Sequence, residues 1–151
     1  MLLGPMLAVG LSLTTALGPA TADPAPRTVQ VTASDEMKFS VTEIAAKPGE
    51  RIRIVLRAFS RAPKIAMAHN VIVLKKGTDV DAFIKASNMA RDTGFVAPAL
   101  SKQIIAATKL AGGGETVQVT FTAPSAPGRY DFVCSFPGHY AAGMRGVLVV
   151  K

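Results

Sequence analysis

Three side chains that can bind a metal follow one another near the end of the 151-residue chain: Cys134, His139 and Met144. Their spacing is Cys-x4-His-x4-Met, and a compact loop of that length can aim a thiolate, an imidazole and a thioether at one point. These soft donors suit copper in both oxidation states. His69, the only other histidine, supplies a fourth donor if its segment ends at the same pole. Two histidines and a cysteine in a plane with a weak axial methionine are the blue-copper geometry, so the pattern predicts one type-1 copper ion.

Taken singly, each of these residues has a simpler explanation. A lone histidine is usually hydrogen-bonded or exposed, a lone methionine usually belongs to the core, and a free cysteine is usually buried and inert. Here the set uses the only cysteine of the chain and both of its histidines. We therefore expect the four residues to act together.

Short segments of alternating hydrophobicity predict the β-strands that position these residues. Val117, Val119 and Phe121 alternate with polar residues, and turn signals such as Lys47-Pro48-Gly49 separate the segments. The pattern is typical of an all-β protein with an antiparallel sandwich or barrel. The expected strands are 28–32, 37–41, 51–56, 70–74, 115–122, 129–134 and 146–150, with a shorter one at 103–107.

One segment, residues 79–89, has the spacing of a helix instead. Its apolar residues Val80, Phe83 and Ile84 are three and four positions apart, as on one face of an amphipathic helix. Residues 92–114 contain several glycines and predict a long connection. We therefore expect a sandwich with one short inserted helix.

The first 22 residues predict a secretory signal peptide. They carry no charged side chain, run apolar from Leu2 to Leu17 and end in Ala20-Thr21-Ala22, a small-residue cleavage site. Left uncleaved, the segment is nearly long enough to anchor the protein in a membrane. We expect cleavage, which leaves one domain at residues 23–151 of an exported, periplasmic protein.

The charge distribution of that domain limits the kinds of partner that we expect it to bind. The net charge of +7 comes from basic residues scattered along the chain, and the longest basic run is Lys75-Lys76. Because export also separates the protein from nucleic acid, no nucleic-acid partner is expected. An exported domain with one cysteine has no internal disulfide, so its core alone must stabilise the fold.

The stretch Cys134-Ser135-Phe136-Pro137-Gly138-His139, with Met67-Ala68-His69-Asn70 before it, resembles the copper loops of azurin and auracyanin. Residues 35–39, 105–110 and 146–151 are similar to azurin segments in the same order. The resemblance to these cupredoxins covers nearly the whole mature chain. It implies an eight-stranded Greek-key β-sandwich with one copper buried at one end, which cycles between Cu(II) and Cu(I), in a protein that is not an enzyme.

The resemblance also implies roles for individual residues. The backbone N–H groups of Asn70 and Phe136 would donate to the cysteine sulfur and tune the reduction potential. Three strong ligands and one weak axial ligand are implied, in that order: His69, Cys134, His139 and Met144.

Two departures from azurin matter for the site. Four residues separate His139 from Met144, as in auracyanin, where azurin has three. Ala68 stands where azurin has a glycine whose carbonyl approaches the metal, and a side chain there can alter that backbone. A fifth ligand at Ala68 therefore stays open.

An electron carrier is the function that these features predict. We expect a monomer that docks briefly with redox proteins such as c-type cytochromes or membrane oxidoreductases. An apolar rim around His139 would suit such docking. Its expected members are Met67, Phe136, Pro137, Gly138, Ala141 and Ala142.

Two other functions fit the sequence less well. A copper enzyme of this fold needs further histidine-rich centres, and both histidines are already used. A periplasmic copper carrier would hold Cu(I) in exposed methionine and histidine clusters, whereas the six methionines here are dispersed or lie in the first 22 residues. The copper carrier is the alternative that remains open.

Overall fold

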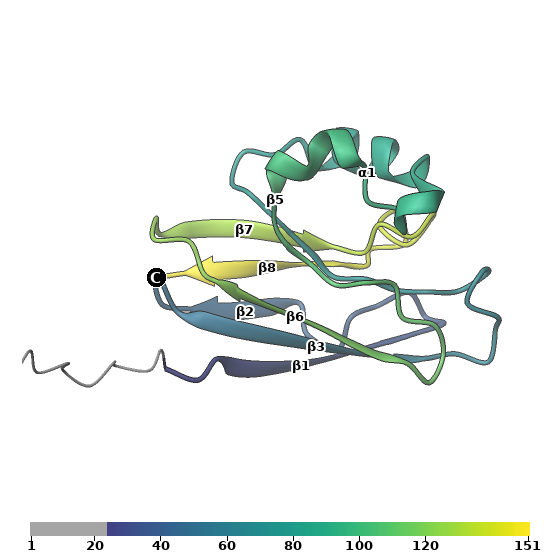
Figure 1. Ribbon diagram of the computed structural model, residues 1–151, viewed down its shortest axis with the longest axis horizontal. Coiled ribbons are helices and arrows are strands. Elements are labelled where there is room, and N and C mark those ends of the chain that lie inside the picture. The colour runs from purple at the N-terminus through teal and green to yellow at the C-terminus, as the bar shows by residue number, and fades with distance from the viewer. Residues whose placement is uncertain (1–23) are drawn as a thin grey trace, which may run out of the picture.

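Two β-sheets packed face to face form the computed structural model, which describes residues 24–151 (Figure 1). One sheet has three strands in the order β1-β3-β6, and the other has five in the order β2-β8-β7-β4-β5. The prediction of an all-β Greek-key sandwich of about eight strands with one short helix is confirmed. The strands are β1 (Arg27–Ser34), β2 (Glu43–Ala46), β3 (Arg51–Phe59), β4 (Ile72–Leu74), β5 (Ile104–Ala107), β6 (Thr116–Thr122), β7 (Gly128–Val133) and β8 (Arg145–Val150).

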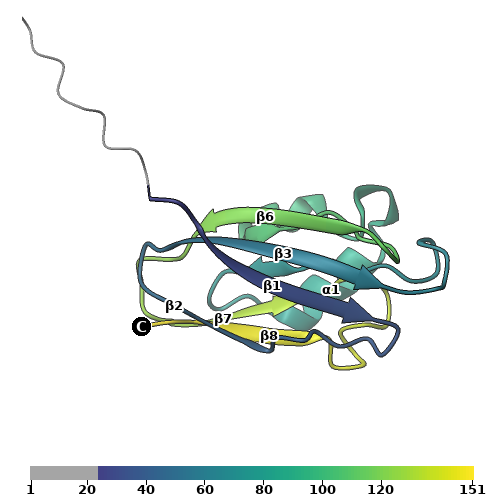
Figure 2. The same ribbon diagram turned by 90° about the horizontal axis from the view of Figure 1, so that it is seen from below.

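The three-stranded sheet shows why alternation predicted strands correctly. In β3, Ile52, Ile54 and Leu56 are fully buried between the sheets, while the residues between them are partly exposed. β3 pairs parallel with β1 and antiparallel with β6, and the three strands lie side by side in Figure 2. This face forms one side of the main core.

The helix α1 (Val80–Asn88) covers the outer face of the five-stranded sheet. Ile72 and Leu74 of β4 pack against Phe83 of the helix, whereas Val73 between them belongs to the core between the sheets. Burial of a side chain like Phe83 contributes about 1.5–3 kcal/mol. The predicted helix at 79–89 is therefore confirmed, and β4 has apolar residues on both faces because both faces are covered.

The connection at residues 92–114 is more structured than expected. It contains β5, which agrees with the short strand predicted at 103–107. It also contains the 3-10 helix η2 (Pro98–Gln103) and most of η1 (Arg91–Thr93), which begins one residue earlier. Such short helices have no extended periodicity, so the sequence pattern did not predict them.

The prediction of a strand at 37–41 is wrong. The backbone N–H of Met37 donates to the Ser34 carbonyl at 2.9 Å and closes a turn, and Met37 has a φ of 53°, outside the β region. Only Phe39 of this segment bridges back to β1. The paired strand lies further on, as β2, which joins β8 in parallel.

The predicted signal peptide at residues 1–22 lies outside the described residues, so its cleavage stays a prediction. Within residues 24–151, no helix combines the length and the hydrophobicity needed to cross a bilayer.

Candidate metal centre

Strand pairing places the segments of His69 and Cys134 at the same end of the five-stranded sheet. β4 and β7 are antiparallel, and Ile72 pairs with Val133. His69 lies shortly before Ile72 and Cys134 directly follows Val133, so both lie beyond this pair at one edge. In Figure 1 this is the end toward which β7 points.

The loop between β7 and β8 returns Met144 to the position of Cys134. The His139 N–H donates to the Phe136 carbonyl at 3.1 Å, and the Met144 N–H donates to the His139 carbonyl at 3.0 Å. The Cys134 N–H then donates to the Met144 carbonyl at 3.1 Å and closes the loop. Gly138 has a φ of 84°, a conformation that glycine adopts without strain.

These elements bring three donor side chains together. The ligand atoms of His69, Cys134 and His139 all lie within 4.8 Å of one another, and all three residues are buried. The Cys134 Sγ lies 3.4 Å from the His139 Nδ1, and the two imidazole centroids are 4.9 Å apart. Met144, on the same loop, is fully buried in the core that contains Cys134.

His69 shows the clearest sign that this cluster accommodates a metal. Both nitrogens of its ring are buried, and within the described part of the chain neither has a hydrogen-bond partner. Its backbone is fixed by a bridge to Ala111, with N–H to carbonyl distances of 2.9 and 2.8 Å. A buried polar atom without a partner costs about 1–3 kcal/mol, and coordination of a metal removes that cost at one nitrogen.

Electrostatics supports the same conclusion for the thiol. Burial raises the pKa of Cys134 to about 11, although the N–H groups of Asn70 and Phe136, which donate to the sulfur, oppose the shift. A thiolate at this position therefore needs a cation beside it at neutral pH. Both donors were expected from the family resemblance.

The two imidazoles are neutral at pH 7. Burial, together with the nearby His69, lowers the pKa of His139 to about 4. Burial also lowers the pKa of His69, partly opposed by Asp35. Each ring thus keeps a free lone pair for a metal without first losing a proton.

A buried polar pair joins the two donor-carrying segments. The Ser135 N–H donates to the Asn70 Oδ1 at 2.9 Å, and the Asn70 Nδ2 donates to the Ser135 Oγ at 2.9 Å. The Ser135 hydroxyl in turn donates to the Phe95 carbonyl. Sequence reasoning missed Ser135 and Phe95, because neither is a metal donor and the three residues come from distant segments.

Aromatic rings enclose the His139 side of the cluster. The Phe136 ring centroid lies 4.8 Å from that of His139, and Phe95 meets Phe136 edge-on at 5.1 Å. Ala68, immediately before His69, is fully buried. The cluster is therefore enclosed by apolar groups and closely packed on these sides, which limits its rearrangement.

The expected apolar rim is exposed in part. Pro137, Gly138 and Ala141 are exposed, while Met67 and Ala142 are half-buried. Phe136 was expected in the rim but is only 8% exposed, because its ring packs inward.

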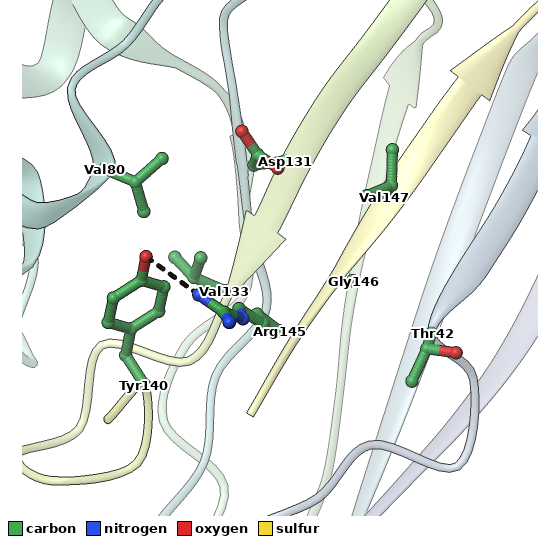
Figure 3. Close-up of a pocket in the computed structure, with 8 residues that line it drawn as sticks. All are labelled: Thr42, Val80, Asp131, Val133, Tyr140, Arg145, Gly146 and Val147. Atoms are coloured by element: carbon green, nitrogen blue, oxygen red, sulfur yellow. Dashed lines mark hydrogen bonds between the residues drawn. The ribbon is translucent and has the colours of Figure 1, made fainter. Parts of the chain in front are cut away.

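A separate cavity of about 360 Å³ opens beside the loop, on the outer face of β7 and β8 (Figure 3). At the edge of the cavity, the Arg145 Nη1 donates to the Tyr140 hydroxyl at 3.3 Å, and the Arg145 guanidinium carbon lies 5.3 Å from the centroid of the Tyr140 ring. None of the lining residues is one of the donor side chains. Pockets are the usual first candidates for a functional site, but here the donor cluster lies elsewhere.

Comparison with known proteins identifies the family. The model of the copper-binding proteins of the plastocyanin/azurin family matches residues 27–151. The chain therefore belongs to this family of cupredoxins. Its buried donors His69, Cys134 and His139, together with Met144, fit a type-1 copper as the cofactor.

Several relatives are between 33% and 38% identical to this chain over the aligned residues. Auracyanin-B of Chloroflexus aurantiacus is 35% identical over 126 residues, which are 82% of this chain and 52% of that protein. Outer membrane protein H.8 of Neisseria meningitidis is 38% identical over 113 residues, 74% of this chain and 61% of the other. The azurin of Alcaligenes faecalis is 33% identical and covers 80% of this chain and 94% of its own length. The chain thus spans only about half to three-fifths of the first two relatives.

Solved structures agree with the fold. The auracyanin of Roseiflexus castenholzii matches with a TM-score of 0.73 at 35% identity, over 85% of this chain and 99% of that one. Auracyanin A of Chloroflexus aurantiacus, described as a blue copper protein, also has a TM-score of 0.73, at 36% identity, and covers 84% of this chain and 100% of its own.

Proposed function

We propose that the protein is an exported electron carrier whose single copper ion is held by His69, Cys134 and His139, with Met144 as the weak axial ligand. The observation that carries this proposal is the buried cluster of two imidazoles and a thiol within 4.8 Å. Copper supplies one-electron chemistry between its Cu(II) and Cu(I) states.

The donors are held in place before a metal binds. His69 is fixed by its bridge to Ala111, and Cys134 by its bond to the Met144 carbonyl. Ligands on a rigid scaffold keep one geometry for both oxidation states, which lowers the cost of moving an electron. The N–H groups of Asn70 and Phe136 stabilise negative charge on the sulfur and so set the preference between the two states.

An electron would enter and leave near His139. Its side chain is only 2% exposed, yet Gly138 and Ala141 on the same loop are exposed, so the donor lies just beneath the surface. The exposed apolar rim suits brief docking with a redox protein, such as a c-type cytochrome or a membrane oxidoreductase. We propose that the carrier works as a monomer and catalyses no reaction of its own.

A periplasmic location completes the proposal. It rests on the predicted signal peptide at residues 1–22 and on the relative named outer membrane protein H.8. Whether the segment is cleaved or kept as an anchor is decided by mass spectrometry of the mature N-terminus.

The test of the function is the colour of the copper-loaded protein. A short Cu(II)–thiolate bond produces an intense blue absorption that histidine and methionine do not supply. Wild-type protein should show this band and a type-1 EPR spectrum, and it should cycle repeatedly in voltammetry. The Cys134→Ser variant should lose the blue band. A wild type that binds copper without the band contradicts the proposal. Release of Cu(I) to a chelator during cycling would favour a copper carrier instead.

A further inference from the structure

Lys38 reaches from the turn after β1 to the loop between His139 and Met144. Its Nζ donates a hydrogen bond to the backbone carbonyl of Ala142. The same ammonium group also lies close to Gly143, since a Cβ atom built on that glycine would be 2.7 Å from the Lys38 Nζ. A cation from a remote segment thus packs directly on the segment that leads into Met144.

The Ala142 carbonyl is a natural place for such a bond. The loop makes one helix-like turn, in which the Ala142 N–H donates to the Gly138 carbonyl at 3.0 Å and the Gly143 N–H to the Tyr140 carbonyl at 2.9 Å. Carbonyls at the end of a turn lack partners within it and attract positive charge. Lys38 supplies both a donor and that charge.

The backbone before Lys38 is held in an unusual conformation. Met37 has a φ of 53°, a left-handed conformation that is strained for a residue other than glycine. Beyond it, the Ser40 N–H donates to the Thr32 carbonyl at 3.0 Å, and the Thr32 N–H donates to the Ser40 Oγ at 2.8 Å. The turn is therefore fixed on both sides of Lys38, and its backbone starts from a defined position.

We propose that Lys38 is a positioning residue for the metal centre. Its ammonium group holds the Ala142 carbonyl and so holds the loop that carries Met144, the axial donor. The effect on an axial ligand rests on the proposed function, whereas the anchoring of the loop by Lys38 is a property of this chain without copper. It assigns control of the axial ligand to a residue outside both donor-carrying segments.

The experiment compares three variants with the wild type. Lys38→Met keeps an apolar stem and removes the cationic donor, and Lys38→Arg keeps a cationic donor. Lys102→Met is the matched control, since Lys102 is an exposed lysine of η2. The carbonyl of the neighbouring Gln103 accepts from the Lys75 N–H at 2.8 Å. Lys102 therefore lies near the end of β4 that is away from His69.

Amide hydrogen exchange of Met144 is measured by NMR in the metal-free and the reduced copper-loaded protein. In metal-free Lys38→Met we expect exchange to be roughly two- to ten-fold faster, the range set by loss of one net hydrogen bond. Lys38→Arg should restore protection, and Lys102→Met should match the wild type. In the oxidised copper form, Lys38→Met should also broaden the EPR spectrum, because the axial sulfur is held less uniformly.

Two results would overturn the inference. One is an unchanged Met144 exchange rate in metal-free Lys38→Met, and the other is an equal acceleration of all core amides, which indicates global destabilisation. A wild type without the blue band would refute the proposed function, while the metal-free exchange data would still decide the role of Lys38.

Discussion

The side chain of Asn70 holds Ser135 through two hydrogen bonds of 2.9 Å, one to its backbone N–H and one with its hydroxyl. Asn70 directly follows His69, and Ser135 directly follows Cys134. The pair therefore fixes the distance between two donor-carrying segments that are far apart in the chain.

Asn70→Ala should destabilise the protein more than Ser135→Ala. The first change leaves the buried Ser135 N–H without its acceptor, at a cost of about 1–3 kcal/mol. Ser135→Ala keeps that bond and takes the hydroxyl from Asn70 and Phe95, but the Asn70 Nδ2 still has a second acceptor, the Gly94 carbonyl at 3.5 Å. Urea denaturation of the metal-free variants measures the difference. Equal losses of stability would mean that the backbone bond contributes little.

Met144→Gln should lower the reduction potential and keep a coloured site. An oxygen donor in the axial position favours Cu(II) more than a thioether does. Met89→Gln is the matched control, because Met89 is 86% exposed at the end of α1. If voltammetry gives the same potential for both variants and the wild type, Met144 is a core residue and not a ligand.

Metal binding at pH 7 should release about one proton, and it should come from the thiol. The pKa of Cys134 is raised to about 11, so the metal-free thiol is protonated, while the lowered pKa values of His139 and His69 leave both rings already neutral. As the pH falls, protons should compete for His139 only near pH 4, below the ordinary histidine range.

Calorimetry with Zn²⁺, a redox-inert ion with the same preference for thiolate and imidazole, measures this proton count in buffers of different ionisation enthalpy. Cys134→Ser should release none. A release that grows between pH 7 and pH 5.5 would show that the histidines titrate at ordinary pKa values.

Ala141→Asp should leave the blue spectrum nearly unchanged and slow electron transfer. Ala141 is exposed in the rim, so a carboxylate there must be desolvated when a partner docks. Ala126→Asp, at an exposed turn before β7, adds the same charge at the other end of the strand. Stopped-flow rates with a c-type cytochrome that are equal for both variants at several salt concentrations would exclude docking through the rim.

The parts that the sequence predicted well depend on local pattern. Ile52, Ile54 and Leu56 alternate with partly exposed residues, so the period of a strand is visible in β3. Cys134 and His139 share one short loop, so their spacing alone limits how far apart they can lie.

The parts that it missed depend on contacts between distant segments. The sequence pattern predicts a strand where the structure has a turn at Met37, because no sequence signal marks a methionine with a left-handed backbone conformation. The bonds of Ser135 to Asn70 and Phe95 join three segments, and no periodic pattern reports such a network. Local rules failed most clearly next to Lys38, where the chain meets the loop of the metal centre.

The pairing of Ile72 with Val133 makes copper loading a check on correct folding. A slip of β4 by one residue would turn Ile72 from the helix side toward the core, since neighbouring residues of a strand face opposite sides. The same slip would carry His69 away from Cys134 by about 3.3 Å, the rise of one residue. Apolar packing and metal coordination therefore select the same register, and a chain misaligned in this sheet would lack the complete set of donors.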